Sequence, residues 1–151
     1  MFTLERVDRQ ALEMVERIAL LLSLPPERVS CQSRAESFFF YNISQPEELW
    51  RHSCLICDFG EERLKTLLLE VNRHTRPATV TVAQEEHPEL ERQDDREEMD
   101  EAFLSIFRSV SDGRIIDTVY LIGDGFAGEW YPKTLAVMCR NRRVFQGNNL
   151  Y

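Results

Sequence analysis

Apolar residues recur every three or four positions near the start of the chain, and charged residues fill many of the positions between them. This spacing predicts an amphipathic helix that ends at Leu24-Pro25-Pro26, because proline lacks the backbone donor that a helix needs. The apolar positions of this helix are Val7, Ala11, Met14, Val15, Ile18, Leu21 and Leu22. A short strand over residues 27–32, a largely buried helix over residues 33–43 and a helical turn reaching Trp50 are expected next.

The centre of the chain has a different pattern. Residues 53–59, 64–71 and 78–83 form three apolar or alternating runs. The stretches that separate them, 60–63 and 72–77, contain glycine, asparagine, proline and charged residues. Short strands joined by such stretches are typical of an antiparallel meander.

Helical and strand patterns alternate in the second half of the chain. Apolar residues over 99–110 predict an amphipathic helix that ends at Asp112-Gly113. A buried strand over residues 115–122 follows, and then a glycine-rich turn. A helix over residues 132–139, with proline near its first turn, and a strand over residues 143–146 complete the order.

This order of elements predicts an α/β fold with a mixed sheet. The sheet combines the three-strand antiparallel meander with parallel strands, and helices are expected on both of its faces. No internal repeat or linker divides the chain. We therefore predict a single domain over residues 1–151.

The formal net charge of −8 is concentrated in one segment. Residues 85–101 hold ten acidic side chains and two arginines, and the remainder of the chain has sixteen charges of each sign. We interpret residues 85–98 as a solvated acidic loop. Such a segment repels a phosphate backbone and no basic stripe compensates for it, so the composition argues against a nucleic-acid partner.

The hydrophobic pattern also argues against a membrane partner. No apolar run approaches the roughly 20 residues of a membrane span. The first residues, Met-Phe-Thr-Leu-Glu-Arg, lack the basic segment and apolar core of a signal peptide. A cytoplasmic location is the resulting expectation.

Two of the four cysteines, Cys54 and Cys57, form a C-x-x-C pattern within the first strand of the meander. Residues three apart on a strand point to opposite faces, so their sulfur atoms are expected to be separated. No second cysteine or histidine pair has metal-ligand spacing. The cysteines are therefore interpreted as structural thiols, and the sequence offers no metal ligand and no catalytic residue.

The segment Val119–Trp130 combines an apolar strand, a glycine-rich turn and a helix start. Gly123, Gly125 and Gly128 match the G-x-G-x-x-G pattern, in which missing Cβ atoms let a phosphate or ribose approach the backbone. Only 23 residues follow Gly128, and no acidic residue stands about 20 positions on, so a dinucleotide fold is not favoured. A tight strand-to-helix turn that holds no ligand remains the alternative.

Two motifs together resemble the second lobe of the superfamily of actin, heat-shock chaperones and sugar kinases. They are Cys54-Leu-Ile-Cys-Asp-Phe-Gly60, which opens the meander, and Val119-Tyr-Leu-Ile-Gly-Asp-Gly125. The resemblance implies a ribonuclease H-like sheet. It also implies that Asp58 and Gly60 reach toward nucleotide phosphates and a metal, and that Gly123-Asp124-Gly125 packs on adenosine. More narrowly, the C-terminal segment from Gly123 onward looks like an uncharacterised bacterial family with an actin-like C-terminal half.

The sequence also departs from that superfamily. Relatives usually continue after the Asp-x-Gly hairpin with small residues and a threonine or serine, whereas this chain has Glu61-Glu62-Arg63. Two added carboxylates would repel a triphosphate. The first lobe, with its own phosphate hairpin, is absent from these residues, so a separate first lobe or a protein partner is expected.

Three functions remain open. The first is a C-terminal lobe with degenerate phosphate contacts that acts as a binding or scaffolding module. The second is one lobe of an active ATPase, in which ATP and Mg²⁺ would be cofactors of the complete two-lobed protein. The third is a plain protein-interaction domain that binds no nucleotide.

Overall fold

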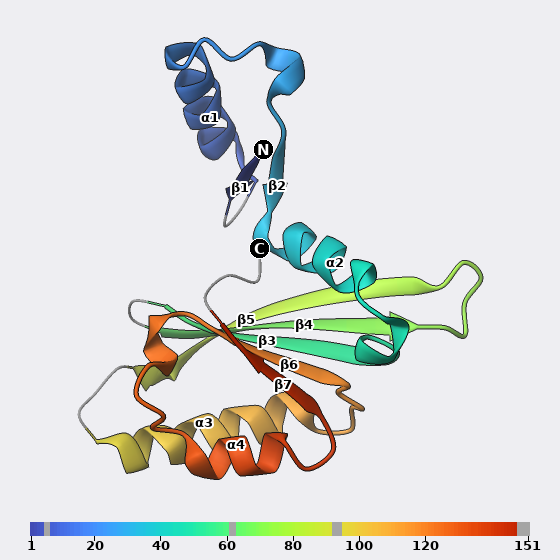
Figure 1. Ribbon diagram of the computed structural model, residues 1–151, viewed down its shortest axis with the longest axis vertical. Coiled ribbons are helices and arrows are strands. Elements are labelled where there is room, and N and C mark those ends of the chain that lie inside the picture. Colours follow the sequence, from blue (N-terminus) through green and yellow to red (C-terminus); the bar gives the residue numbers. More distant parts are fainter. Residues whose placement is uncertain (5–6, 61–62, 92–94, 148–151) are drawn as a thin grey trace. The chain divides into compact units, whose positions relative to one another are not determined.

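The computed structural model describes residues 1–4, 7–60, 63–91 and 95–147 (Figure 1). It divides into two compact units, one from Met1 to Ser44 and one from Gln45 onward. The single domain predicted from the sequence therefore contains two units, and each has its own secondary structure.

The first unit contains the predicted helix, α1 (Arg9–Leu21). The helix starts where the Asp8 carboxylate accepts a hydrogen bond from the Ala11 amide, 2.9 Å away, which satisfies one of the free donors of the first turn. A strand that the sequence did not predict, β1 (Phe2–Leu4), pairs in parallel with β2 (Cys31–Ser33). Residues 26–28 form a 3₁₀ turn, η1 (Pro26–Arg28), so the strand predicted over 27–32 is correct only at its end.

Helix α2 (Arg34–Ser44) confirms the helix predicted over residues 33–43. A reciprocal capping box fixes its start. The Ser33 amide donates to Glu36 Oε2 at 2.7 Å, and the Glu36 amide donates to Ser33 Oγ at 3.1 Å. Hydrogen bonding by the Ser33 amide, with a smaller contribution from the Ser33 side chain, favours the ionised carboxylate and lowers the pKa of Glu36.

The second unit is built on a five-stranded sheet with the order β5-β4-β3-β6-β7. Strands β3–β4 and β4–β5 pair antiparallel, whereas β3–β6 and β6–β7 pair in parallel, so the predicted meander with added parallel strands is confirmed. The strands are β3 (Ser53–Phe59), β4 (Arg63–Asn72), β5 (Thr79–Glu91), β6 (Thr118–Ile122) and β7 (Arg143–Gln146). A 3₁₀ turn, η2 (Glu47–Leu49), forms the turn expected before Trp50.

The prediction of an acidic loop over residues 85–98 is wrong for those of its residues that the structure describes. Residues 85–91 are the second half of β5, and Asp95 is the N-cap of a helix. The strand tolerates these charges because most of its side chains stay exposed to water while its backbone pairs with β4. The remaining part of the predicted loop, residues 92–94, lies outside the described residues.

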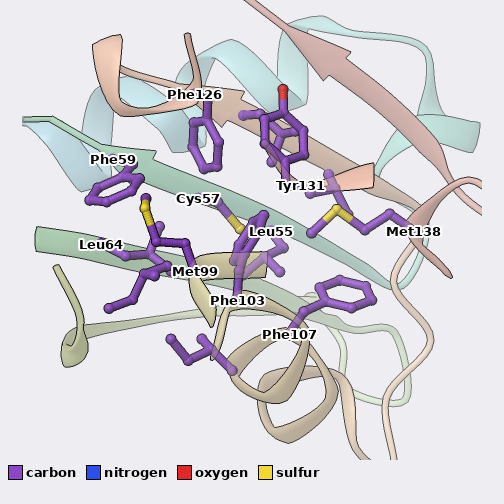
Figure 2. Packing of buried hydrophobic residues seen from close by; sticks show 14 of the residues in the cluster. Leu55, Cys57, Phe59, Leu64, Met99, Phe103, Phe107, Phe126, Tyr131 and Met138 are labelled. Carbon is purple, nitrogen blue, oxygen red and sulfur yellow. The ribbon is translucent and has the colours of Figure 1, made fainter. Parts of the chain in front are cut away.

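Helices α3 (Arg96–Ser111) and α4 (Pro132–Met138) pack on one face of this sheet (Figure 1). Helices α1 and α2 belong to the first unit, so helices on both faces of the sheet stay a prediction. Side chains of both helices meet strand side chains of the same face in a closely packed core (Figure 2). Fully buried members include Leu55, Phe59, Leu64, Phe103, Phe107, Phe126 and Met138.

None of the helices in the described residues combines the length and the apolar character that crossing a bilayer requires.

Candidate functional site

The structure brings the two predicted motifs together at one edge of the sheet. Strands β3 and β6 are parallel neighbours, and Asp58 stands in register with Ile122. Gly60 and Gly123 therefore follow the carboxyl ends of adjacent strands. This is the edge at which open α/β sheets commonly bind ligands.

Gly123 is held where only glycine fits. Its φ angle is +95°, a conformation that other residues rarely adopt. A Cβ atom at Gly123 would lie 2.6 Å from the carbonyl carbon of Phe59 and 3.0 Å from the amide nitrogen of Gly60. The turn after β6 thus packs its backbone directly on the backbone at the end of β3.

Gly125 packs against the side chain of the same phenylalanine. A Cβ atom at Gly125 would lie 2.6 Å from Cδ1 of Phe59 and 2.6 Å from its carbonyl oxygen. The Phe59 ring is fully buried, with edge-to-face contacts to Phe126 and Trp130 at centroid distances of 5.9 and 5.8 Å. The Trp130 indole donates a 2.6 Å hydrogen bond to the Gly125 carbonyl. The space left by the two missing Cβ atoms is therefore filled from inside the protein.

The other three candidate residues differ in the space around them and in their exposure to solvent. Among the described residues other than its chain neighbours, nothing lies within 4 Å of a Cβ atom built at Gly60. Asp124 is exposed at the start of a 3₁₀ turn, η3 (Asp124–Phe126), and its carbonyl accepts the Ala127 amide at 3.0 Å. Asp58 is half-buried at the end of β3. The open part of the candidate site thus consists of Gly60 and Asp124, with Asp58 partly covered.

The two cysteines of the C-x-x-C pattern are separated, as the strand geometry predicted. Cys57 belongs to the core beneath α3 and α4, whereas Cys54 Sγ lies 3.1 Å from the carbonyl oxygen of Leu49. Burial raises the pKa of Cys54 to about 12, with a further contribution from the Asp117 charge, and burial and Asp58 raise the pKa of Cys57. Both thiols are neutral at physiological pH. Among the described residues, no three His, Cys, Asp or Glu side chains gather as metal ligands.

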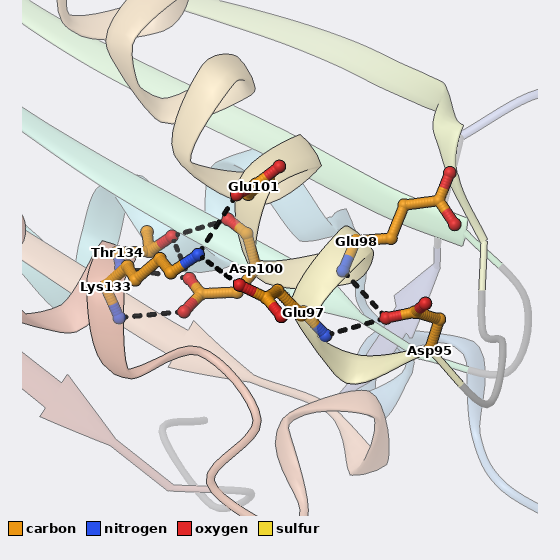
Figure 3. Close-up of polar contacts among 7 residues, drawn as sticks. All are labelled: Asp95, Glu97, Glu98, Asp100, Glu101, Lys133 and Thr134. Atoms are coloured by element: carbon orange, nitrogen blue, oxygen red, sulfur yellow. Dashed lines mark hydrogen bonds and ion pairs between the residues drawn. The ribbon is translucent and has the colours of Figure 1, made fainter.

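Asp100 organises a polar cluster that the sequence did not reveal (Figure 3). Its carboxylate is 2% exposed and accepts hydrogen bonds from the Lys133 amide at 2.8 Å, the Thr134 amide at 3.0 Å and Thr134 Oγ1 at 2.6 Å. These are free donors of the first turn of α4, so a residue of α3 caps a neighbouring helix. An acidic residue three positions before Phe103, on the apolar side of α3, is the signal that could have indicated it.

The Lys133 side chain completes this cluster. Its ammonium group lies 3.0 Å from Glu97 and 3.0 Å from Glu101, and these hydrogen bonds raise the pKa of Lys133. The cluster ties the exposed side of α3 to α4. It positions the helices that cover the core, and its groups are already engaged with one another.

A second buried polar chain joins β4 and β5. The Thr66 hydroxyl lies 2.8 Å from His87 Nε2, and His87 Nδ1 lies 3.2 Å from Glu89. This is the order hydroxyl, imidazole, carboxylate that nucleophilic enzymes use. Thr66 is only 3% exposed in the middle of a strand, however, so the geometry serves to satisfy a buried imidazole. The sequence analysis missed the pair because it placed His87 in a loop.

No curated protein matches this chain. One family model does match, and it covers residues 1–151 with the description "family of unknown function (DUF5716) C-terminal". The chain therefore belongs to the family of unknown function DUF5716, as its C-terminal part.

Proposed function

We propose that this chain is the C-terminal lobe of an actin-like protein whose nucleotide contacts are degenerate, and that it works as a binding or scaffolding module. The proposal assigns the sheet to the ribonuclease H-like class. It also proposes that the sheet edge formed by Asp58, Gly60 and Gly123–Gly125 corresponds to the surface that binds the nucleotide in actin-like proteins.

The strand arrangement supports the assignment of the fold. A three-strand antiparallel meander lies beside two parallel strands, with the order β5-β4-β3-β6-β7. The Asp-x-Gly segment and the Gly-x-Gly turn end adjacent parallel strands of this sheet. The resemblance required both features, and they depend on pairing between residues more than 60 positions apart.

The packing of Phe59 is the observation that favours a degenerate site. In the resemblance, Gly123 and Gly125 lie bare against adenosine. Here the direction of each missing Cβ is taken by Phe59, whose ring is buried among Phe126 and Trp130. The glycines therefore have a sufficient structural role without a nucleotide.

An active ATPase is the second candidate. Gly60 has open space around it and Asp124 is exposed, so a phosphate could approach this part of the edge. Asp58 would then face a phosphate-bound Mg²⁺. In the third candidate, a plain interaction domain, the glycine turn binds nothing.

A thermal-shift measurement of the two-lobed protein with MgATP and MgADP separates the first two candidates. Our proposal predicts no shift in Tm. An ATPase would be stabilised by about 2.7 kcal/mol at a nucleotide concentration of one hundred times Kd.

The substitution Gly60→Asp makes this test specific. Its side chain would enter open space, so folding is retained, but its charge would repel a phosphate. Ser105→Asp on the exposed side of α3 is the matched control. A shift that Gly60→Asp abolishes and Ser105→Asp preserves would establish the ATPase candidate and overturn ours. Substituting Gly125 is not diagnostic, because any side chain there collides with Phe59.

A further inference from the structure

Among the described residues of the second unit, strand β5 pairs on one side of its backbone and leaves the other side open. It stands at the end of the strand order, and β4 is its neighbour in the sheet that the described residues form (Figure 1). It is also the longest strand, with 13 residues, and most of them are exposed. A long open edge pairs with another strand unless charges, proline or a cover prevent it.

The two halves of β5 differ in this protection. Residues 85–91 carry four glutamates and Pro88, and the pairing with β4 is irregular near Arg63 and Leu64. Residues 79–84 read Thr-Val-Thr-Val-Ala-Gln, with no charge and with β-branched side chains. Val82 is 40% exposed. Charge and proline thus protect the second half of the edge and leave the first half open.

We infer that two copies of this chain pair through residues 79–84 of β5, antiparallel and about a two-fold axis at Thr81. In this register Val80 of one copy stands opposite the partner's Val82, and the reverse pair forms on the other side of the axis. Cross-strand pairs of β-branched residues stabilise a sheet. The five-stranded sheets of the two copies join into one.

Charge complementarity selects a second copy in this register. The segment that leads into β5 is basic, with Arg73 and Arg76, and the end of β5 is acidic. An antiparallel pair centred on Thr81 directs the loop that carries Arg76 toward the partner's Glu86, which also lies 3.5 Å from Lys65 of its own chain, and symmetry repeats the pair. A register centred on the acidic half would instead place Glu85 opposite the partner's Glu89, and like charges directly opposite destabilise a sheet.

The interface does not involve the glycine turn or Asp58, so the inference is independent of nucleotide binding. Pairing through six residues buries little surface compared with a permanent dimer. The expected affinity is therefore micromolar, and the dimer should form in proportion to concentration.

Sedimentation velocity of the complete chain tests the inference. We expect a concentration-dependent species of twice the 17.7 kDa chain mass. Val82→Lys should raise Kd at least about tenfold, because it places a charge opposite the partner's Val80 at two symmetric positions. A chain that stays at its monomer mass at all concentrations up to the millimolar range would overturn the proposal.

A charge exchange distinguishes this register from other modes of dimerisation. Glu86→Arg and Arg76→Glu should each weaken self-association, because each variant brings like charges together at both symmetric pairs. An equimolar mixture should form a mixed dimer at about the wild-type affinity, since opposite charges then face each other. Glu16→Lys, a change of the same sign as Glu86→Arg in the first compact unit, is the control and should leave Kd unchanged. Failure of the mixture to recover, or an equal effect of Glu16→Lys, would contradict the register.

Discussion

Single residues decide what the glycine turn can do. Gly123, Gly125 and Gly60 look alike in the sequence, yet a Cβ atom would collide with Phe59 at the first two and meet open space at the third. The sequence could indicate that glycines were needed near this edge. It could not show which neighbour required them, because Phe59 is 66 residues from Gly125 and reaches it only through strand pairing.

Alanine substitutions should separate these glycines. We expect Gly125→Ala to lower the free energy of unfolding by about 1–3 kcal/mol through overpacking, and Gly123→Ala to cost more because its φ is also positive. Gly60→Ala should stay within about 0.5 kcal/mol of wild type. Urea unfolding gives these values. In a Phe59→Leu background Gly125→Ala should cost less, and equal costs in both backgrounds would contradict the packing account.

The capping box at the start of α2 makes part of the stability depend on pH. Hydrogen bonds from Ser33 lower the folded pKa of Glu36 below its unfolded value. The contribution is therefore complete above the unfolded pKa and is lost as pH falls through the folded pKa. Urea unfolding between neutral pH and pH of about 3 should show this loss, and Glu36→Gln should reduce the slope relative to wild type. Equal slopes in both proteins would contradict this role of Glu36.

At the scale of elements, hydrophobic patterning predicted the bounds of one interior strand, β3, and of one edge strand, β7. The bounds of β3 and β7 match the predicted ranges 53–59 and 143–146. The second half of β5 escaped prediction because an edge strand keeps its side chains in water, so its sequence has no apolar alternation to reveal it. Strand β1 escaped because three residues are too few to establish a period.

The contact between α3 and α4 depends on Asp100. Asp100→Ala would leave the Lys133 and Thr134 amides without their acceptor in a buried position, and the Thr134 hydroxyl would keep only the backbone carbonyl of residue 100. We expect a loss of about 2–3 kcal/mol in the free energy of unfolding. Ser105→Ala, on the exposed side of the same helix, should change it by less than about 0.5 kcal/mol. Similar values for both variants would show that the cluster has no special role.

At the scale of the whole molecule, two compact units share one chain, and the family model spans both of them. The order of helices and strands and the mixed sheet could be predicted from sequence. The packing of Phe59 against the glycines of the candidate site could not be predicted, because it depends on a contact between residues far apart in the sequence. In our proposal, the module keeps the sheet edge of a nucleotide-binding lobe, and its own aromatic side chains occupy the position of the ligand.

The most direct test is a titration with MgATP of the two-lobed protein in which this chain is ¹⁵N-labelled, followed by the amide resonances of Gly60, Gly123 and Gly125. Our account predicts no saturable shift of these resonances up to millimolar nucleotide. Saturable shifts confined to these glycines and to Asp58 and Asp124 would contradict it and would identify the edge as a working nucleotide site.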